Sequence, residues 1–303
     1  MSEFILQTEG LTKIYGRQHA VDNLNLSIEK GAIYGLIGKN GAGKTTTLKM
    51  AAGLAAPTKG SISLFGKSGR EMVSVRDRVS CLIEEPGLYK SMTAYENLKA
   101  KCLGVGISSD RYIKEILEIV GLADTAKKKA GEFSLGMRQR LGIALALVGE
   151  PDLLILDEPI NGLDPKGILE IRNLLTTINK EKGITILISS HILEELSKVA
   201  THYGIMNKGH LVEQLTAEEL NVACSLRIEA TVSSPALATP ILDRLGITEY
   251  KVLDRENIAI FERLSDIELI NHELILAGVG VKKICVNNEN LETYFLERTE
   301  GEK

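Results

Sequence analysis

The sequence predicts an α/β fold in which a mainly parallel sheet is covered by helices. Two almost fully apolar runs, 153–156 and 184–188, have the length and composition of strands that are buried on both faces. A third run, 32–37, leads through a glycine-rich turn into a helix-like segment at 46–52. Because buried strands alternate with helices along the chain, the order is that of an α/β core.

Length and composition limit the number of domains and the class of protein. The 303 residues are enough for about two domains, and 44% hydrophobic with 25% charged residues is typical of a soluble globular chain. A net charge of −4 argues against a surface that coats nucleic acid. The most apolar stretch, 141–148, is shorter than the ~20 residues of a spanning helix. Four scattered cysteines are expected to be free, buried thiols in a reducing cytoplasm: Cys81, Cys102, Cys224 and Cys285.

The first thirty residues predict short strands at 4–8, 20–22 and 24–28, the last with period-two alternation. Two more short β-like runs follow the glycine-rich turn, at 61–65 and 79–83. We therefore expect several strands in addition to those of the buried parallel sheet.

The glycine-rich turn carries the pattern G-x-x-x-x-G-K-[ST] between a strand and a helix. Its glycines let backbone N–H groups point at phosphate oxygens, and the helix that begins near Gly43 adds its positive dipole end. Lys44 would place a charge between the β- and γ-phosphates, and Thr45 would offer a hydroxyl to Mg²⁺. The turn predicts binding of ATP or GTP by Gly38, Lys39, Asn40, Gly41, Ala42, Gly43, Lys44, Thr45 and Thr46.

Two carboxylates, Asp157 and Glu158, follow the buried strand 153–156. The carboxyl ends of strands are where ligands bind in open α/β sheets. Asp157 would hold Mg²⁺, directly or through water, and Glu158 would polarise the attacking water. Alone, the pair could equally be a solvated acidic turn. Together with the phosphate loop it predicts hydrolysis of the nucleotide.

The middle of the chain is helical from about 92 to 130, where Thr93 begins a capping-box pattern. Ser134 stands before the apolar helical run 135–149, so its hydroxyl and the following N–H groups form an anion site at a helix N-terminus. A further helix near 165–181 separates the two buried strands.

The pattern changes near residue 215, and we expect a second domain at 216–303. Its order β-α-β-β-α-β suggests a small α+β domain of the ferredoxin-like kind. No arrangement of metal ligands or of a nucleophile stands out in it. The predicted elements are strand 225–232, helix 235–245, strands 249–253 and 257–261, helix 266–277, strand 281–286 and helix 290–298.

With these segments in this order, the sequence resembles the ABC-type ATPase family over residues 1 to about 215. The resemblance implies a P-loop NTPase core with an antiparallel β subdomain, and a helical subdomain inserted at about 90–150. Besides the phosphate loop and the two carboxylates, it is carried by the signature-like Phe133–Arg140, the D-loop-like Asn161–Asp164, the switch-like Ser189-Ser190-His191, and Tyr15 within Leu11–Gly16.

The resemblance also implies roles for single residues. Catalysis would fall to Glu158, His191 and Lys44, and the adenine of ATP would stack on Tyr15. His191 could otherwise be structural, and Tyr15 could be an ordinary core or surface tyrosine. Three residues would contact the nucleotide of an opposite subunit, so that two subunits enclose two ATP molecules: Ser134, Gly136 and Asp164. Mg²⁺ would be held by Thr45, Asp157 and Glu84.

Two departures from the family pattern stand out. Leu135 replaces the first of two glycines in the signature, and Met137 stands where Gln is common, although Ser134 and Gly136 remain. Glu84 occupies the place of a Gln in the loop that joins the core to the helical subdomain. Since an acid adds negative charge near phosphates, we expect Glu84 to make activity more dependent on the Mg²⁺ concentration.

The function that the resemblance implies is that of the ATP-hydrolysing subunit of a bacterial ABC exporter. It would lie at the cytoplasmic face of the membrane, pair with a second ATPase subunit, and drive a separate transmembrane permease. The segment 84–99, with Leu88, Tyr89, Met92 and Tyr95, would meet this permease or form ordinary subdomain core. Residues 86–98 and the signature resemble most the bacitracin and lantibiotic (peptide antibiotic) export branch. The alternatives are a soluble ABC ATPase acting on ribosomes or nucleic acid, and a transporter-like sensor.

Overall fold

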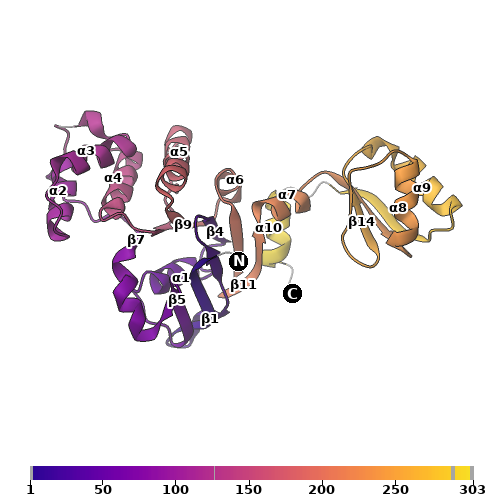
Figure 1. The fold of residues 1–303 in the computed structure, drawn as a ribbon, viewed down its shortest axis with the longest axis horizontal. Helices are drawn as coiled ribbons and strands as arrows, with labels where there is room; N and C mark the ends of the chain where they lie inside the picture. Colours follow the sequence, from indigo (N-terminus) through magenta and orange to yellow (C-terminus); the bar gives the residue numbers. More distant parts are fainter. Residues whose placement is uncertain (1–2, 126, 288–290, 301–303) are drawn as a thin grey trace. The chain divides into compact units, whose positions relative to one another are not determined.

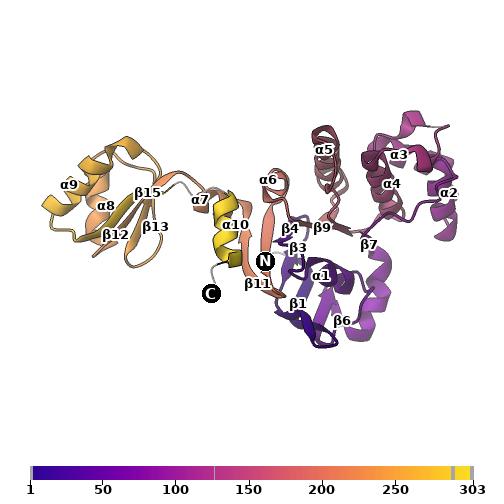
Figure 2. The same cartoon turned by 180° about the vertical axis from the view of Figure 1, so that it is seen from behind.

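The computed structural model describes residues 3–125, 127–287 and 291–300. The chain forms two compact units, one up to Ala217 together with the residues from Glu297 on, and the other at Glu218–Leu296. Figures 1 and 2 show the ribbon from opposite sides. The predicted division at 215/216 lies close to the first change of unit, whereas the end of the chain clusters with the first unit.

A six-stranded sheet forms the centre of the first unit, in the order β11-β10-β4-β9-β8-β7. All neighbouring strands in this sheet are parallel except β10 and β11, which form an antiparallel hairpin. Every residue of β4, β8 and β9 is buried. This sheet confirms the predicted α/β core. Its strands are β4 (Ile33–Gly38), β7 (Val79–Leu82), β8 (Leu153–Asp157), β9 (Thr185–Ser190), β10 (His202–Asn207) and β11 (His210–Thr216).

A second sheet of antiparallel strands lies near the N-terminus, in the order β2-β1-β5-β6, with β3 also pairing with β1. The first strand is longer than the predicted 4–8 and extends to Tyr15, with register shifts along its pairs. The strands are β1 (Phe4–Tyr15), β2 (Gln18–Leu24), β3 (Ser27–Glu29), β5 (Lys59–Leu64) and β6 (Lys67–Ser68).

Helices contact these sheets or form the inserted subdomain, in which α2, α3 and α4 contact one another (Figure 1). The predicted capping box is confirmed, because Thr93 Oγ1 accepts from the N–H of Glu96 and the Glu96 carboxylate accepts from the N–H of Thr93. The helices are α1 (Lys44–Ala51), α2 (Ala94–Gly104), α3 (Asp110–Ile119), α4 (Leu135–Leu147), α5 (Pro165–Lys182) and α6 (Leu193–Leu196), with 3-10 turns at Gly69–Arg78, Ala123–Thr125 and Ala130–Glu132.

The second unit is a four-stranded antiparallel sheet in the order β13-β14-β12-β15, with α8 and α9 packed against one face (Figure 2). The order β-α-β-β-α-β is the predicted one, and the strand order is that of a ferredoxin-like fold. Its elements are β12 (Arg227–Val232), α8 (Pro235–Arg244), β13 (Tyr250–Val252), β14 (Asn257–Ile260), α9 (Ile267–Leu276) and β15 (Val281–Asn287).

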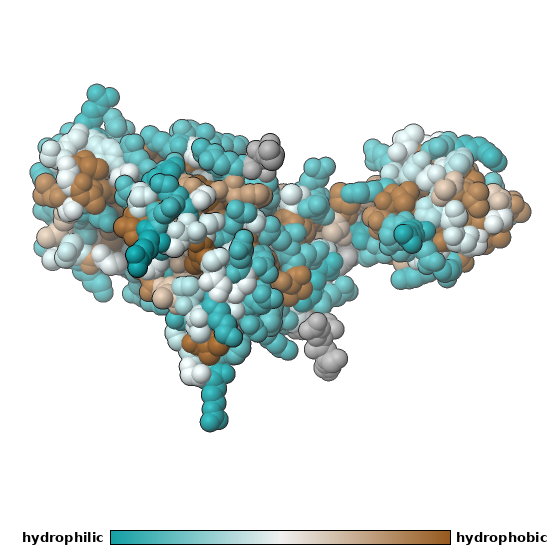
Figure 3. All heavy atoms as spheres, turned by 60° about the horizontal axis from the view of Figure 1, so that its bottom comes forward, coloured by the Kyte–Doolittle hydropathy of each residue, from teal (hydrophilic) through white to brown (hydrophobic). Residues whose placement is uncertain are grey.

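Two further helices, α7 (Ala217–Ala223) and α10 (Leu291–Glu300), contain the residues at which the chain changes from one unit to the other. On the face drawn in Figure 3, apolar residues gather in small separate groups among hydrophilic ones. None of the helices in the described ranges combines the length and the apolar character that crossing a bilayer requires.

Candidate nucleotide-binding site

The phosphate loop connects the central strand β4 to α1, and its glycines are sterically required. Gly41 and Gly43 have φ angles of 84° and 104°, in the left-handed region that side chains disfavour. A Cβ on Gly43 would lie 2.4 Å from the carbonyl oxygen of Ala20. Gly43 is also the residue that precedes the first turn of α1, so the free N–H groups of that turn border the loop.

A hollow of about 350 Å³ lies over this loop. Tyr15 is half exposed at its rim, and the Nζ of Lys13 lies 5.0 Å from the centre of the Tyr15 ring. The hollow brings Tyr15, Glu158 and most of the predicted loop residues together with Asn161 of the D-loop-like segment, and adds Gln18 and Ala20, which were not predicted as site residues. Its lining is Tyr15, Gln18, Ala20, Asn40, Gly41, Ala42, Gly43, Lys44, Thr45, Thr46, Glu158 and Asn161.

Lys44 is buried below the loop with its charge balanced. Its Nζ donates to the carbonyl oxygens of Gly38 at 2.7 Å and Lys39 at 3.4 Å. It also lies 3.2 Å from Oε1 of Glu158. Because only 6% of the side chain is exposed, this carboxylate and the two carbonyls replace the water that the ammonium lacks.

Asp157 joins three elements of the fold. One carboxylate oxygen accepts from Thr45 Oγ1 at 2.9 Å, and the other accepts from Ser189 Oγ at 2.6 Å. Hydroxyl and carboxylate oxygens are the ligands that Mg²⁺ prefers, so Thr45 and Asp157 fit the predicted metal site. Ser189 was not selected as a site residue, although a serine at the end of a buried strand, next to the strand that carries Asp157, was a usable signal.

Glu158 stands between the two other predicted catalytic residues. Its Oε2 lies 2.8 Å from Nδ1 of His191, and its opposite oxygen faces Lys44. Its backbone has φ of +47°, which is uncommon for a residue with a side chain, and its N–H donates to Ser189 Oγ at 3.0 Å. The strand end therefore turns sharply and directs the two neighbouring carboxylates to different partners.

The predicted trans-contact residues line a different hollow of about 420 Å³, and not the one over the phosphate loop of the same chain. Ser134 Oγ accepts from the N–H of Met137 at the start of α4, and Asp164 accepts from the N–H of Gly167 at the start of α5. The lining comprises Ser134, Leu135, Gly136, Met137, Arg140, Gly162, Leu163, Asp164, Lys166, Gly167 and Glu170.

Glu84 lies in an ion pair with α1. Its Oε1 is 2.6 Å from Lys49 Nζ, and 68% of the Glu84 side chain is exposed. The hydrogen bond that Lys49 donates to Glu84 raises the pKa of the lysine above its usual value. Of the three predicted Mg²⁺ ligands, Glu84 therefore contacts Lys49, while Asp157 is bonded to Thr45 and to Ser189.

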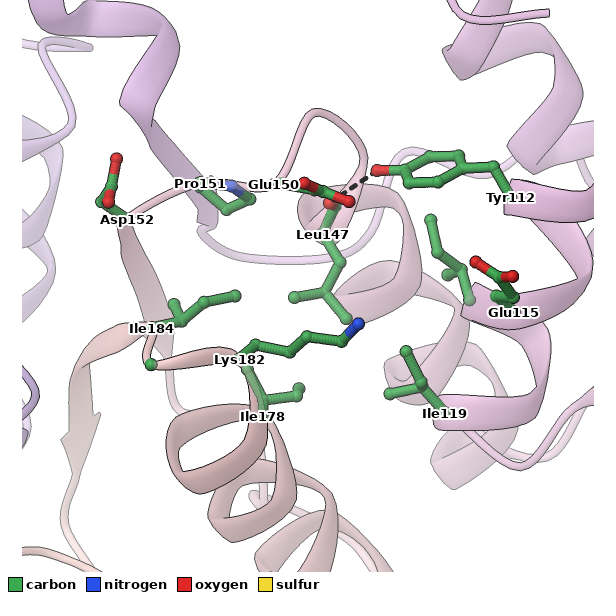
Figure 4. A pocket seen from close by; sticks show the side chains of 12 residues that line it. Tyr112, Glu115, Ile119, Leu147, Glu150, Pro151, Asp152, Ile178, Lys182 and Ile184 are labelled. Atoms are coloured by element: carbon green, nitrogen blue, oxygen red, sulfur yellow. Dashed lines mark hydrogen bonds between the residues drawn. The ribbon is translucent and has the colours of Figure 1, made fainter. Parts of the chain in front are cut away.

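A further hollow of about 260 Å³ contains none of the predicted site residues (Figure 4). Tyr112 closes one side, where its hydroxyl donates to the carbonyl of Leu147 and accepts from the N–H of Gly149. Two of its acids are already paired, Glu115 with Arg111 and Asp152 with Arg78. The lining consists of Tyr112, Glu115, Ile116, Ile119, Leu147, Glu150, Pro151, Asp152, Ile178, Lys182, Gly183 and Ile184.

A phosphate loop whose threonine is bonded to the carboxylate at the end of a second buried strand of the same sheet is the site of a P-loop nucleoside triphosphatase. The model of the family described as "ABC transporter" matches residues 21–161. The bacitracin transport ATP-binding protein BcrA of Enterococcus faecalis is 44% identical over 97% of this chain and 96% of its own. The chain therefore belongs to the ABC transporter family, as a nucleotide-binding ATPase subunit of a transporter.

One further relative and one solved structure are also similar to this chain. The lantibiotic transport ATP-binding protein SrtF of Streptococcus pyogenes is 46% identical over 69% of this chain and 89% of its own. The solved structure of cbiO1 from Clostridium perfringens, part of the ABC transporter complex cbiONQ, has a TM-score of 0.67 at 27% identity. It covers 80% of this chain and 96% of that one.

We expect Ser189→Ala to raise the Mg²⁺ concentration needed for half-maximal ATPase activity about tenfold, because Asp157 loses a hydrogen bond that orients it. Ser190→Ala is the matched control, since the Ser190 hydroxyl accepts from the N–H of Ile192. Equal Mg²⁺ requirements in the two variants would show that Ser189 does not orient the carboxylate.

The ion pair of Glu84 can be tested in both directions. We expect Glu84→Gln to lower the half-saturating Mg²⁺ concentration and Lys49→Met to raise it, each roughly twofold to fivefold, as for an exposed ion pair. The physical reason is that Lys49 neutralises a carboxylate near the phosphates. An unchanged Mg²⁺ dependence in Glu84→Gln contradicts the expectation.

Proposed function

We propose that this chain hydrolyses Mg-ATP in a dimer of ATPase subunits, and that it drives export of a peptide antibiotic through a separate membrane protein. The observation that carries the hydrolytic part is the position of Glu158 between Lys44 and His191. The names of the bacitracin and lantibiotic relatives support the class of cargo, because the bacitracin relative matches nearly the full length.

The contacts of Glu158 suggest how ATP would prepare its own hydrolysis. A γ-phosphate over the loop would attract the Lys44 ammonium, which would leave Oε1 of Glu158 free to accept a proton from water. His191 would hold the other oxygen of Glu158 and keep the carboxylate oriented. Mg²⁺ held by Thr45 and Asp157 would neutralise charge on the β- and γ-phosphate oxygens.

A second subunit would complete the site. Ser134, Gly136 and Asp164 line their own hollow, so they would reach a γ-phosphate only on another copy or a related chain. The hydroxyl of Ser134 and the N–H groups at the start of α4 are suited to an anion. Leu135 is 39% exposed beside them, so its side chain would take part in that interface.

The permease would dock on the helical subdomain. A hollow of about 350 Å³ there is lined by Gly87, Tyr89, Asn97, Ala100, Lys101, Gly104, Val105 and Leu145. Tyr89 and Met92 are exposed, while Leu88 and Tyr95 are half-buried, so these residues are not closed core. The buried Asn97 accepts from the N–H of Tyr89 and donates to its carbonyl, which holds the exposed loop in place. Such a contact would place the chain at the cytoplasmic face of the membrane.

Glu158→Gln is expected to bind ATP and dimerise, but to hydrolyse ATP at least about a hundredfold more slowly because the general base is lost. Phosphate release and size-exclusion chromatography with Mg-ATP measure the two properties. Glu181→Gln, at an exposed position of α5, serves as the control. Turnover at the control rate would remove Glu158 from the mechanism.

The partner is tested by purifying the tagged full-length chain in mild detergent from its own cells, with mass spectrometry of what accompanies it. We expect one polytopic membrane protein in stoichiometric amount, and Tyr89→Glu should release it because the charge enters the proposed docking hollow. Ribosomal proteins or nucleic acid in its place would overturn the exporter assignment and leave the ATPase.

A further inference from the structure

The turn between β10 and β11 touches the phosphate loop. Lys208 and Gly209 both have positive φ angles, 46° and 88°, as in the tight type I′ turn that joins two antiparallel strands. The N–H of Gly209 donates to the carbonyl of Ala42 in the phosphate loop at 3.0 Å, and its carbonyl accepts from the N–H of Asp22 at 2.9 Å. The turn therefore supports the loop from the side of β10.

Met206, which stands two residues before the turn, packs closely against the loop. Met206 is aligned with Gly38 in the parallel register of β10 and β4. A Cβ on Gly38 would lie 2.7 Å from the Met206 carbonyl oxygen, and a Cβ on Gly43 would lie 3.2 Å from the Met206 methyl group. A displacement of the end of β10 would thus be felt directly by the phosphate loop.

The last turn of α10 is hydrogen-bonded to the hairpin of β10 and β11. Asn207 Nδ2 donates to the carbonyl of Thr299 at 3.0 Å, and Arg298 Nε donates to Glu213 on β11 at 2.6 Å. The last carbonyls of a helix have no partner within the helix, so the Asn207 amide caps the end of α10. Thr299 is 6% exposed, and all four residues belong to the first unit.

We propose that Asn207 is a positioning residue for nucleotide binding: by capping α10 it holds the turn that supports the phosphate loop, so that the C-terminal helix sets the affinity for ATP. Asn207 lies between Met206 and the turn, both of which contact the phosphate loop. The side chain of Asn207 itself is hydrogen-bonded to α10. The described residues of α10 that precede Glu297 cluster with the second unit, whereas Arg298 and Thr299 cluster with the first.

The decisive variant is Asn207→Asp, which keeps the shape of the side chain but cannot donate to a carbonyl and places a negative charge at the negative end of a helix. We expect the Kd for ATP, measured by competition with a fluorescent nucleotide in Mg²⁺, to rise about threefold to tenfold, as for the loss of one hydrogen bond. The KM for ATP should rise with it, while kcat and the melting temperature without nucleotide stay at the level of the control. That control is Asn271→Asp, the same exchange on a half-buried position of α9.

Arg298 provides a second test that does not depend on the folding of the first variant. Arg298→Gln should weaken ATP binding and Arg298→Lys should retain most of it, because the lysine preserves the charge opposite Glu213. If both contacts act by holding α10 against the hairpin, the double variant Arg298→Gln/Asn207→Asp should raise the Kd for ATP by less than the product of the two single effects. A Kd equal to that of Asn271→Asp, or a rise in Kd matched by a general loss of melting temperature, overturns the proposal.

Discussion

The carboxylate of Asp157 joins the elements of the candidate nucleotide site. It accepts hydrogen bonds from Thr45 on α1 and from Ser189 on β9, and so connects the phosphate loop, the strand that carries the acids, and the strand that leads to His191. All three elements meet at the carboxyl edge of one parallel sheet, where ligands bind in α/β folds. Because Asp157 is only 8% exposed, these hydrogen bonds replace those that water would make.

The neighbouring carboxylate is placed by the same geometry. The positive φ of Glu158 turns its side chain away from Asp157, toward Lys44 and His191. One strand end thus presents an acid suited to a metal ion beside an acid suited to water. Ser134 and Asp164 line a separate hollow on the same chain.

Much of this organisation could be predicted from local patterns. The apolar runs of β4, β8 and β9, the phosphate loop, the capping box at Thr93 and the β-α-β-β-α-β order of the second unit were all recognised, since each is encoded within a few neighbouring residues. No element was predicted at β10, whose apolar run contains Gly204, or at β11, an edge strand in which only Leu215 is buried. The return of the end of α10 to the first unit was likewise not predicted.

The sequence by itself determined the class of the protein, because the phosphate-loop pattern and the paired carboxylates are short motifs whose local backbone is dictated by glycine sterics and by strand and helix ends. Only the tertiary structure decided which side chains meet. Thr45 and Asp157 are 112 positions apart, and Asn207 and Thr299 are 92 positions apart. Glu84 likewise meets Lys49 on a helix that no local pattern relates to it. Such pairs depend on the packing of strands and helices around a common core, so they exist only once the chain has folded.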